Sequence, residues 1–108
     1  PVGELSVTEA CDKAIAAMTA MADLVDAAKG NCDAMATSLE KWLADNKAFI
    51  EWGKAQDADA AKKQAFEAAC KPKLEENMKA VLPKMMGAGQ CANNERVRAA
   101  LKSLESKP

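Results

Sequence analysis

Four cysteines carry the most distinctive chemistry of this chain. They are Cys11, Cys32, Cys70 and Cys91, and the interval from Cys11 to Cys32 equals the interval from Cys70 to Cys91. Cysteine sulfur serves as a metal ligand, a redox thiol or half of a disulfide. Zinc sites and thiol redox catalysts favour cysteines a few positions apart, but this chain has no Cys-x-x-Cys motif and no histidine. The spacing therefore favours structural disulfides.

A Cu(I) site is the one metal chemistry that the sulfur residues allow. Met85 and Met86 lie close to Cys91 in sequence, and soft thioether and thiolate ligands suit Cu(I). The six methionines of the chain nevertheless recur at helical spacing, which is typical of core residues. We keep Cu(I) binding as a remote alternative and predict no metal-binding residue.

Side chains for acid–base or nucleophilic catalysis are scarce. The chain has no histidine and no tyrosine, which removes the commonest general base and a frequent proton donor. None of its serines stands in a glycine-flanked nucleophile elbow. Adjacent helical carboxylates such as Glu75 and Glu76 point about 100° apart and share no site. We therefore expect a protein that is not an enzyme, with no catalytic residue and no cofactor.

The elements that hold the cysteines are helices. Alanine, the strongest helix former, is the commonest residue. The capping-box pattern from Ser6 to Glu9 predicts a first helix over 7–29, which Gly30 ends.

A second helix is predicted over 32–53, with Asn31 as its N-cap. It is expected to fade near Gly53. Asn46 lies on its apolar stripe, either as a polar residue that sets the register or as a local break.

A third helix is predicted to begin at Asp57 or Asp59. Pro72 predicts a kink or break in it near Lys71, because proline has no backbone N–H and crowds the preceding turn. A short fourth helix follows from Asn93 or Asn94. The expected fold is all-α: an antiparallel bundle of three long helices plus a shorter C-terminal fourth, in a single domain over 1–108. Residues 1–5 are expected to be an N-terminal tail or linker remnant.

Helix lengths choose among the three possible disulfide pairings. Cys11 and Cys70 each lie roughly 26 Å, at about 1.5 Å per residue, from the turns at the far ends of the first and third helices. Cys32 and Cys91 lie at those turns. Bridged cysteines need Cα atoms within about 7 Å, so we expect the pairs Cys11–Cys70 and Cys32–Cys91, unless the third helix is badly broken at Pro72. Either bridge is worth on the order of 4 kcal/mol in chain entropy.

Trp52 is the residue that departs from its local pattern. On a helical wheel for 32–53 it falls opposite the apolar stripe, and large aromatic residues are frequent anchors of protein interfaces. The charged residues on that face are Lys41, Asp45 and Glu51. We name Trp52 as the candidate partner-binding residue. The alternative is that the helix bends near Asn46 or Gly53 and packs Trp52 against the N-terminus or the third helix.

Charge and composition exclude several classes of partner. The net charge is −1, which gives no general attraction to nucleic acid. No run of apolar residues is long enough for a transmembrane segment. Two disulfides favour an exported protein, in the periplasm, at the cell surface or secreted. The chain has no Asn-x-Ser/Thr acceptor and begins at Pro1, so we expect a bacterial source and a signal or anchor segment that is not in this chain.

Two functions are consistent with these features. The first is a non-enzymatic structural or protein-interaction module, with an unknown protein partner contacting Trp52. The second is a carrier of a small apolar ligand or lipid, held in an alanine- and methionine-lined space between the helices.

Overall fold

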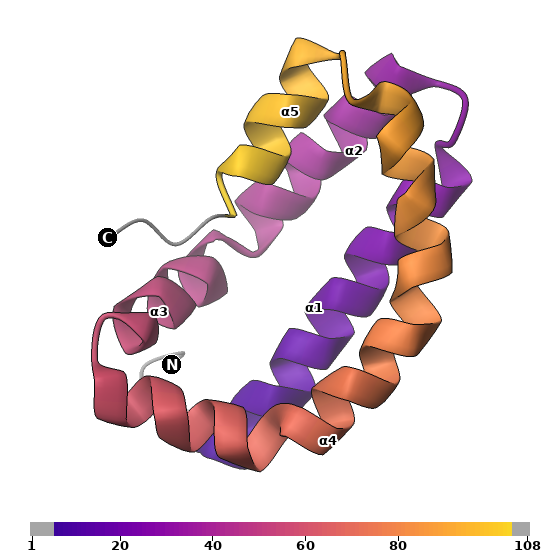
Figure 1. Cartoon of the computed structure of the whole chain (residues 1–108). Coiled ribbons are helices and arrows are strands. Elements are labelled where there is room, and N and C mark those ends of the chain that lie inside the picture. Colours follow the sequence, from indigo (N-terminus) through magenta and orange to yellow (C-terminus); the bar gives the residue numbers. More distant parts are fainter. Residues whose placement is uncertain (1–5, 105–108) are drawn as a thin grey trace.

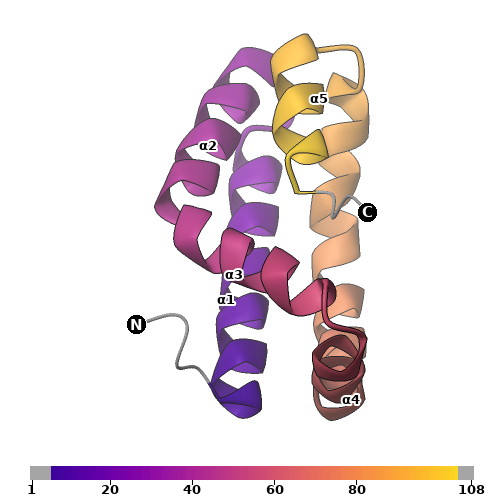
Figure 2. The same ribbon diagram turned by 90° about the vertical axis from the view of Figure 1, so that its left-hand side faces the viewer.

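The computed structural model describes residues 6–104, and over that range the chain is helical without strands. Its elements are α1 (Val7–Ala27), α2 (Cys32–Asp45), α3 (Lys47–Asp57), α4 (Ala60–Met85), the 3-10 helix η2 (Met86–Cys91) and α5 (Glu95–Lys102). The helices α1 and α4 lie side by side, α5 packs on α2, and α3 connects the end of α2 to the start of α4 (Figures 1 and 2). The predicted all-α bundle is confirmed. The predicted tail at residues 1–5 lies outside the described residues.

Both ends of α1 and the start of α2 are built as the sequence predicts. The Ser6 hydroxyl accepts a hydrogen bond from the backbone of Glu9 (3.1 Å), and the Glu9 carboxylate accepts one from the backbone of Ser6 (3.3 Å). This capping box starts α1. At the other end, Gly30 has a φ of 85°, in the left-handed region that favours glycine. The side chain of Asn31 then caps α2.

The helix predicted over 32–53 is in fact two helices, because the chain breaks at Asn46; of the two interpretations of this residue, the local break is confirmed. This residue ends α2 and precedes α3 with φ −107° and ψ 10°. Its side-chain amide donates to the carbonyl of Trp42 (2.9 Å), which also accepts the backbone N–H of Asn46 (3.0 Å). An asparagine that bonds its own backbone in this way competes with helix continuation. The fading predicted at Gly53 is also wrong, since α3 continues to Asp57.

The helix α4 is continuous but not straight. Asp59 caps it by accepting hydrogen bonds from the next turn. Pro72 lies near its middle, and the ribbon changes direction between the first and second halves (Figure 1). This is a kink rather than a break, as expected where a proline removes one hydrogen bond from the ladder.

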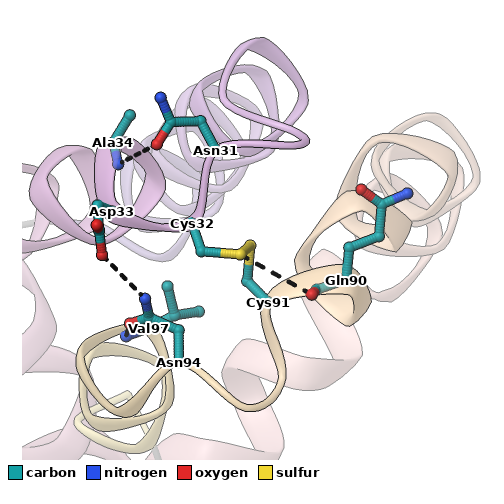
Figure 3. The surroundings of a disulfide bond; sticks show 8 residues. All are labelled: Asn31, Cys32, Asp33, Ala34, Gln90, Cys91, Asn94 and Val97. Atoms are coloured by element: carbon teal, nitrogen blue, oxygen red, sulfur yellow. Dashed lines mark hydrogen bonds between the residues drawn. A yellow bond between two sulfur atoms is a disulfide. The ribbon is translucent and has the colours of Figure 1, made fainter.

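Two disulfides join the helices in the predicted pairing. Cys11 on α1 is bonded to Cys70 on α4, with Cα atoms 5.6 Å apart, and Cys32 on α2 to Cys91 at the end of η2, with Cα atoms 5.3 Å apart. Both pairs are separated by 59 residues. Figure 3 shows the second bridge at the turn between η2 and α5, where the side-chain amide of Asn94 donates to Asp33 of α2 (3.2 Å). The N-terminus of α2 is therefore tied to the segment that leads into α5.

The main hydrophobic core surrounds this second bridge. It joins α1, α2, η2 and α5, and its buried side chains are small or aliphatic. We call it the clamped core; its buried members are Val25, Met35, Ala36, Leu39, Cys91, Val97 and Ala100.

Candidate functional site

A cleft of about 360 Å³ lies beside α3, away from the end of the bundle that holds the Cys32–Cys91 bridge. It is bordered by α1, α2, α3, α4 and the residue Leu104 beyond α5. We call it the aromatic cleft, and it is lined by Ala14, Ala17, Met18, Trp42, Phe49, Ile50, Trp52, Gly53, Lys54, Gln56, Asp57, Phe66 and Leu104. More than half of its positions come from α3. The break at Asn46 produces this site, because it lets α3 leave the line of α2 and border the cleft.

Every aromatic side chain of the protein lines this cleft. The sequence contains two tryptophans, two phenylalanines and no tyrosine. They are Trp42, Phe49, Trp52 and Phe66, contributed by three different helices. No described member of the clamped core is aromatic. Trp42 is buried, whereas Phe49, Trp52 and Phe66 are only half-buried where they line the cleft.

Hydrogen bonding and stacking fix three of these rings. Trp42 is 9% exposed, and its indole N–H donates to the carbonyl of Ala17 on α1 (3.1 Å). Phe49 and Trp52 stack, with ring centroids 5.7 Å apart and planes inclined by 15°. The ammonium of Lys13 lies 5.9 Å from the Phe49 ring centre, within cation–π range.

The helix α3 is loosely buried for a helix in a bundle. None of its side chains is fully buried, and Phe49, Ile50 and Trp52 are half-buried along the cleft. A helix whose apolar face is only half covered leaves apolar surface exposed that a ligand or partner can bury. That surface faces the cleft.

Polar lining is confined to the last turn of α3, at Lys54, Gln56 and Asp57. The Lys54 ammonium donates to the carbonyl of Ser103, just beyond α5, at 2.7 Å. A smaller hollow of about 250 Å³ adjoins the aromatic cleft and shares Ile50 and Lys54 with it. Lys54 therefore stands where the two spaces meet.

The residues whose pKa values are shifted lie outside the aromatic cleft. Hydrogen bonding to Arg96 holds the pKa of Glu40 below its ordinary value, and the same pair raises the pKa of Arg96. The carboxylate of Asp23 raises the pKa of Lys84 through a hydrogen bond. None of these groups lines the aromatic cleft. They join α2 to α5 and α1 to α4 on the outer surface.

The residues named from the sequence fall in different places. The four cysteines form two structural bridges, so the sulfur of Cys91 is bonded and offers no thiolate to Cu(I). Met86 is 75% exposed. Within residues 6–104, no group of three or more His, Cys, Asp or Glu side chains is placed to hold a metal ion.

Trp52 lies beside Phe49 on the aromatic cleft and is half-buried. Its role as a contact for a partner stays a prediction. The aromatic cleft matches the expected alanine- and methionine-lined space only in part, because its alanine and methionine lining consists of Ala14, Ala17 and Met18 on α1. The wheel for one straight helix could not bring Trp52 to Phe66, because the break at Asn46 redirects α3 toward α4.

Comparisons with known families, curated proteins and solved structures identify no significant match to this chain. Within the described part of the chain, no helix is both long and apolar enough to cross a membrane.

Proposed function

We propose that this protein is a non-enzymatic binding protein that carries a small apolar ligand in the aromatic cleft. The observation that supports this most strongly is the gathering of all four aromatic side chains around one cleft. Ligand sites are typically concave, mainly apolar and aromatic, and contain a few polar groups. The volume of about 360 Å³ falls in the usual range for such sites.

The rest of the fold is suited to hold such a cleft. Two disulfides and the clamped core fix α1, α2 and α4 independently of any ligand. Among the helices of residues 6–104, α3 alone lacks buried side chains, so ligand contacts would complete its packing. The disulfides also support an exported protein in an oxidising compartment, and we propose a bacterial source on the absence of a glycosylation acceptor.

Fluorescence tests the proposal directly, since both tryptophans line the cleft. The probe is N-phenyl-1-naphthylamine, a neutral aromatic dye that accepts energy from tryptophan and brightens in apolar surroundings. We expect saturable binding of one dye per chain, with quenching of the tryptophan emission. An absence of saturable binding would contradict a carrier role.

Two variants of α1 provide the matched control. Ala14 lines the cleft, whereas Ala16 on the same helix is exposed. Ala14→Phe is expected to fill the cleft and weaken dye binding by about tenfold, roughly 1.4 kcal/mol, while Ala16→Phe leaves it unchanged. Equal effects of both substitutions would place the dye elsewhere.

A protein-interaction module contacting Trp52 is the competing function. Trp52→Ala separates the two, because a partner contact requires this side chain but not Phe66 on α4. If ligand binding is correct, Trp52→Ala and Phe66→Ala both weaken dye binding. If no dye binds to the wild-type protein, the interaction module becomes the better proposal.

A further inference from the structure

The polar residue at the junction of the two hollows points to the chemical class of the ligand. Lys54 is half-buried, and its ammonium donates a hydrogen bond to the Ser103 carbonyl. Among residues 6–104 it forms no ion pair with a carboxylate. An ammonium that is partly removed from water, and that pairs with no carboxylate of the described residues, is stabilised by a nearby anion.

The ammonium also has unused donors. A lysine side chain carries three N–H groups and no acceptor. One is directed to Ser103, and the other two have no acceptor among residues 6–104. Charge-assisted hydrogen bonds of this kind are about twice as strong as neutral ones.

The smaller hollow extends the site beyond Lys54. Its remaining lining residues are Leu43, Ala44, Lys47, Ile50, Glu51 and Ser103. Lys47 and Lys54 are seven residues apart on α3 and so lie on the same face of the helix. Glu51 stands between them, and Asp57 lines the aromatic cleft. Both carboxylates belong to exposed residues, so water screens them more than it screens half-buried Lys54.

We infer that the ligand is an amphipathic anion, whose apolar part occupies the aromatic cleft and whose carboxylate or other anionic head binds the ammonium of Lys54 at the junction with the smaller hollow. This inference rests on the proposed function, because it assigns a head group to the ligand of the same cleft. A medium-chain fatty acid has this chemistry. The apolar part supplies most of the affinity, and the lysine sets the preference for the head group.

The test compares three ligands with the same ten-carbon chain: decanoate, decan-1-ol and decylamine. Each is titrated as a competitor of bound N-phenyl-1-naphthylamine. Decanoate is expected to bind about fivefold to tenfold more tightly than decan-1-ol, and decylamine more weakly than either. Added salt should reduce this preference, because it screens the partly exposed charge pair.

Variants of Lys54 assign the preference to its charge. Lys54→Met is expected to bring decanoate to the affinity of decan-1-ol without weakening the alcohol. Lys54→Arg keeps the charge and the donors, so it should retain the preference. Lys41→Met, which removes an exposed lysine outside both hollows, serves as the control and should change nothing. Circular dichroism verifies that each variant is folded.

The outcomes separate the two proposals. If none of the three ligands displaces the dye and the dye itself does not bind, the proposed function fails. If decan-1-ol binds as tightly as decanoate, or Lys54→Met leaves their ratio unchanged, the function stands and the anionic head group is wrong. Tightest binding of decylamine would assign the head group to Asp57 and also overturn the inference.

Discussion

The two ends of this bundle use apolar residues in opposite ways. At the end that contains Cys32–Cys91, the clamped core buries small and aliphatic side chains almost completely. At the other end, Phe49, Trp52 and Phe66 remain half-buried around a cleft. Aromatic side chains bury the most apolar surface per residue, so a sequence selected only for stability would place them in the core. The half-buried aromatic side chains are the difference on which the proposed ligand binding rests.

The largest expected effect comes from removing the disulfides. Both bridges span 59 residues, so loss of chain-entropy stabilisation predicts about 4 kcal/mol for either pair. We expect Cys32→Ala with Cys91→Ala, and separately Cys11→Ala with Cys70→Ala, to lower the free energy of unfolding by similar amounts in urea titrations. A loss below about 1 kcal/mol for either pair would show that the bridge is not a main stabiliser.

Leu39 and Leu104 allow the contribution of side-chain packing to stability to be compared between the clamped core and the aromatic cleft. Leu39 is 1% exposed in the clamped core, whereas Leu104 is half-buried and lines the aromatic cleft. Leu39→Ala should cost about 3 kcal/mol, because it leaves a cavity that the bridged helices cannot close. Leu104→Ala should cost less than about 1 kcal/mol. Equal losses in denaturant titrations would argue that the cleft is part of the core.

Gly30 and Gly53 allow the effect of backbone conformation on stability to be compared without any effect of side-chain contacts. A Cβ added at Gly30 or at Gly53 meets no atom within 4 Å, so only conformation distinguishes them. Gly30 has a φ of 85°, and Gly30→Ala should destabilise by about 1 kcal/mol. Gly53 lies within α3, and Gly53→Ala should stabilise by about 0.5–1 kcal/mol. Thermal unfolding measures both changes; stabilisation by Gly30→Ala would contradict the assigned turn.

The smallest expected effect is the pH dependence of the ion pair between α2 and α5. In the folded protein, hydrogen bonding to Arg96 lowers the pKa of Glu40 below the ordinary glutamate value of 4.5. The pair therefore contributes stability above about pH 4.5 and loses it as the pH falls through the folded pKa. Because both side chains are about half exposed, the contribution is small. Unfolding midpoints of the wild type and Glu40→Gln should differ at neutral pH and converge in acid, and a difference independent of pH would exclude this pair as its cause.

Local signals in the sequence predict the clamped end well. Ser6, Gly30 and Asn31 specify their caps and turn through interactions within a few residues. The cysteine pairing follows from helix length, because the rise per residue fixes the height of each sulfur as long as α4 continues through Pro72, which it does.

The cleft depends on geometry that the sequence leaves open. Asn46 was compatible with a continuous helix or a break, and the choice rests on whether its side chain turns back to the Trp42 carbonyl. Once the chain breaks there, α3 takes a new direction and Trp52 reaches the space shared with Phe66. A wheel drawn for a straight helix places Trp52 on a charged face instead. Only the recurrence of four aromatic residues in 32–66 gave a signal of this site, and its meaning required the tertiary arrangement.

Mapping a ligand by NMR is the most direct test of the division between the two ends. Backbone and indole N–H signals of ¹⁵N-labelled protein are recorded during titration with decan-1-ol, so that the apolar cleft is tested apart from the head group. We predict saturable shifts for the indoles of Trp42 and Trp52 and for the amide of Gly53, with the amides of Val97 and Ala100 in the clamped core unchanged. No saturable shift, or shifts confined to exposed Met78, Leu82 and Met86 on the outer side of the bundle, would contradict ligand binding in the aromatic cleft.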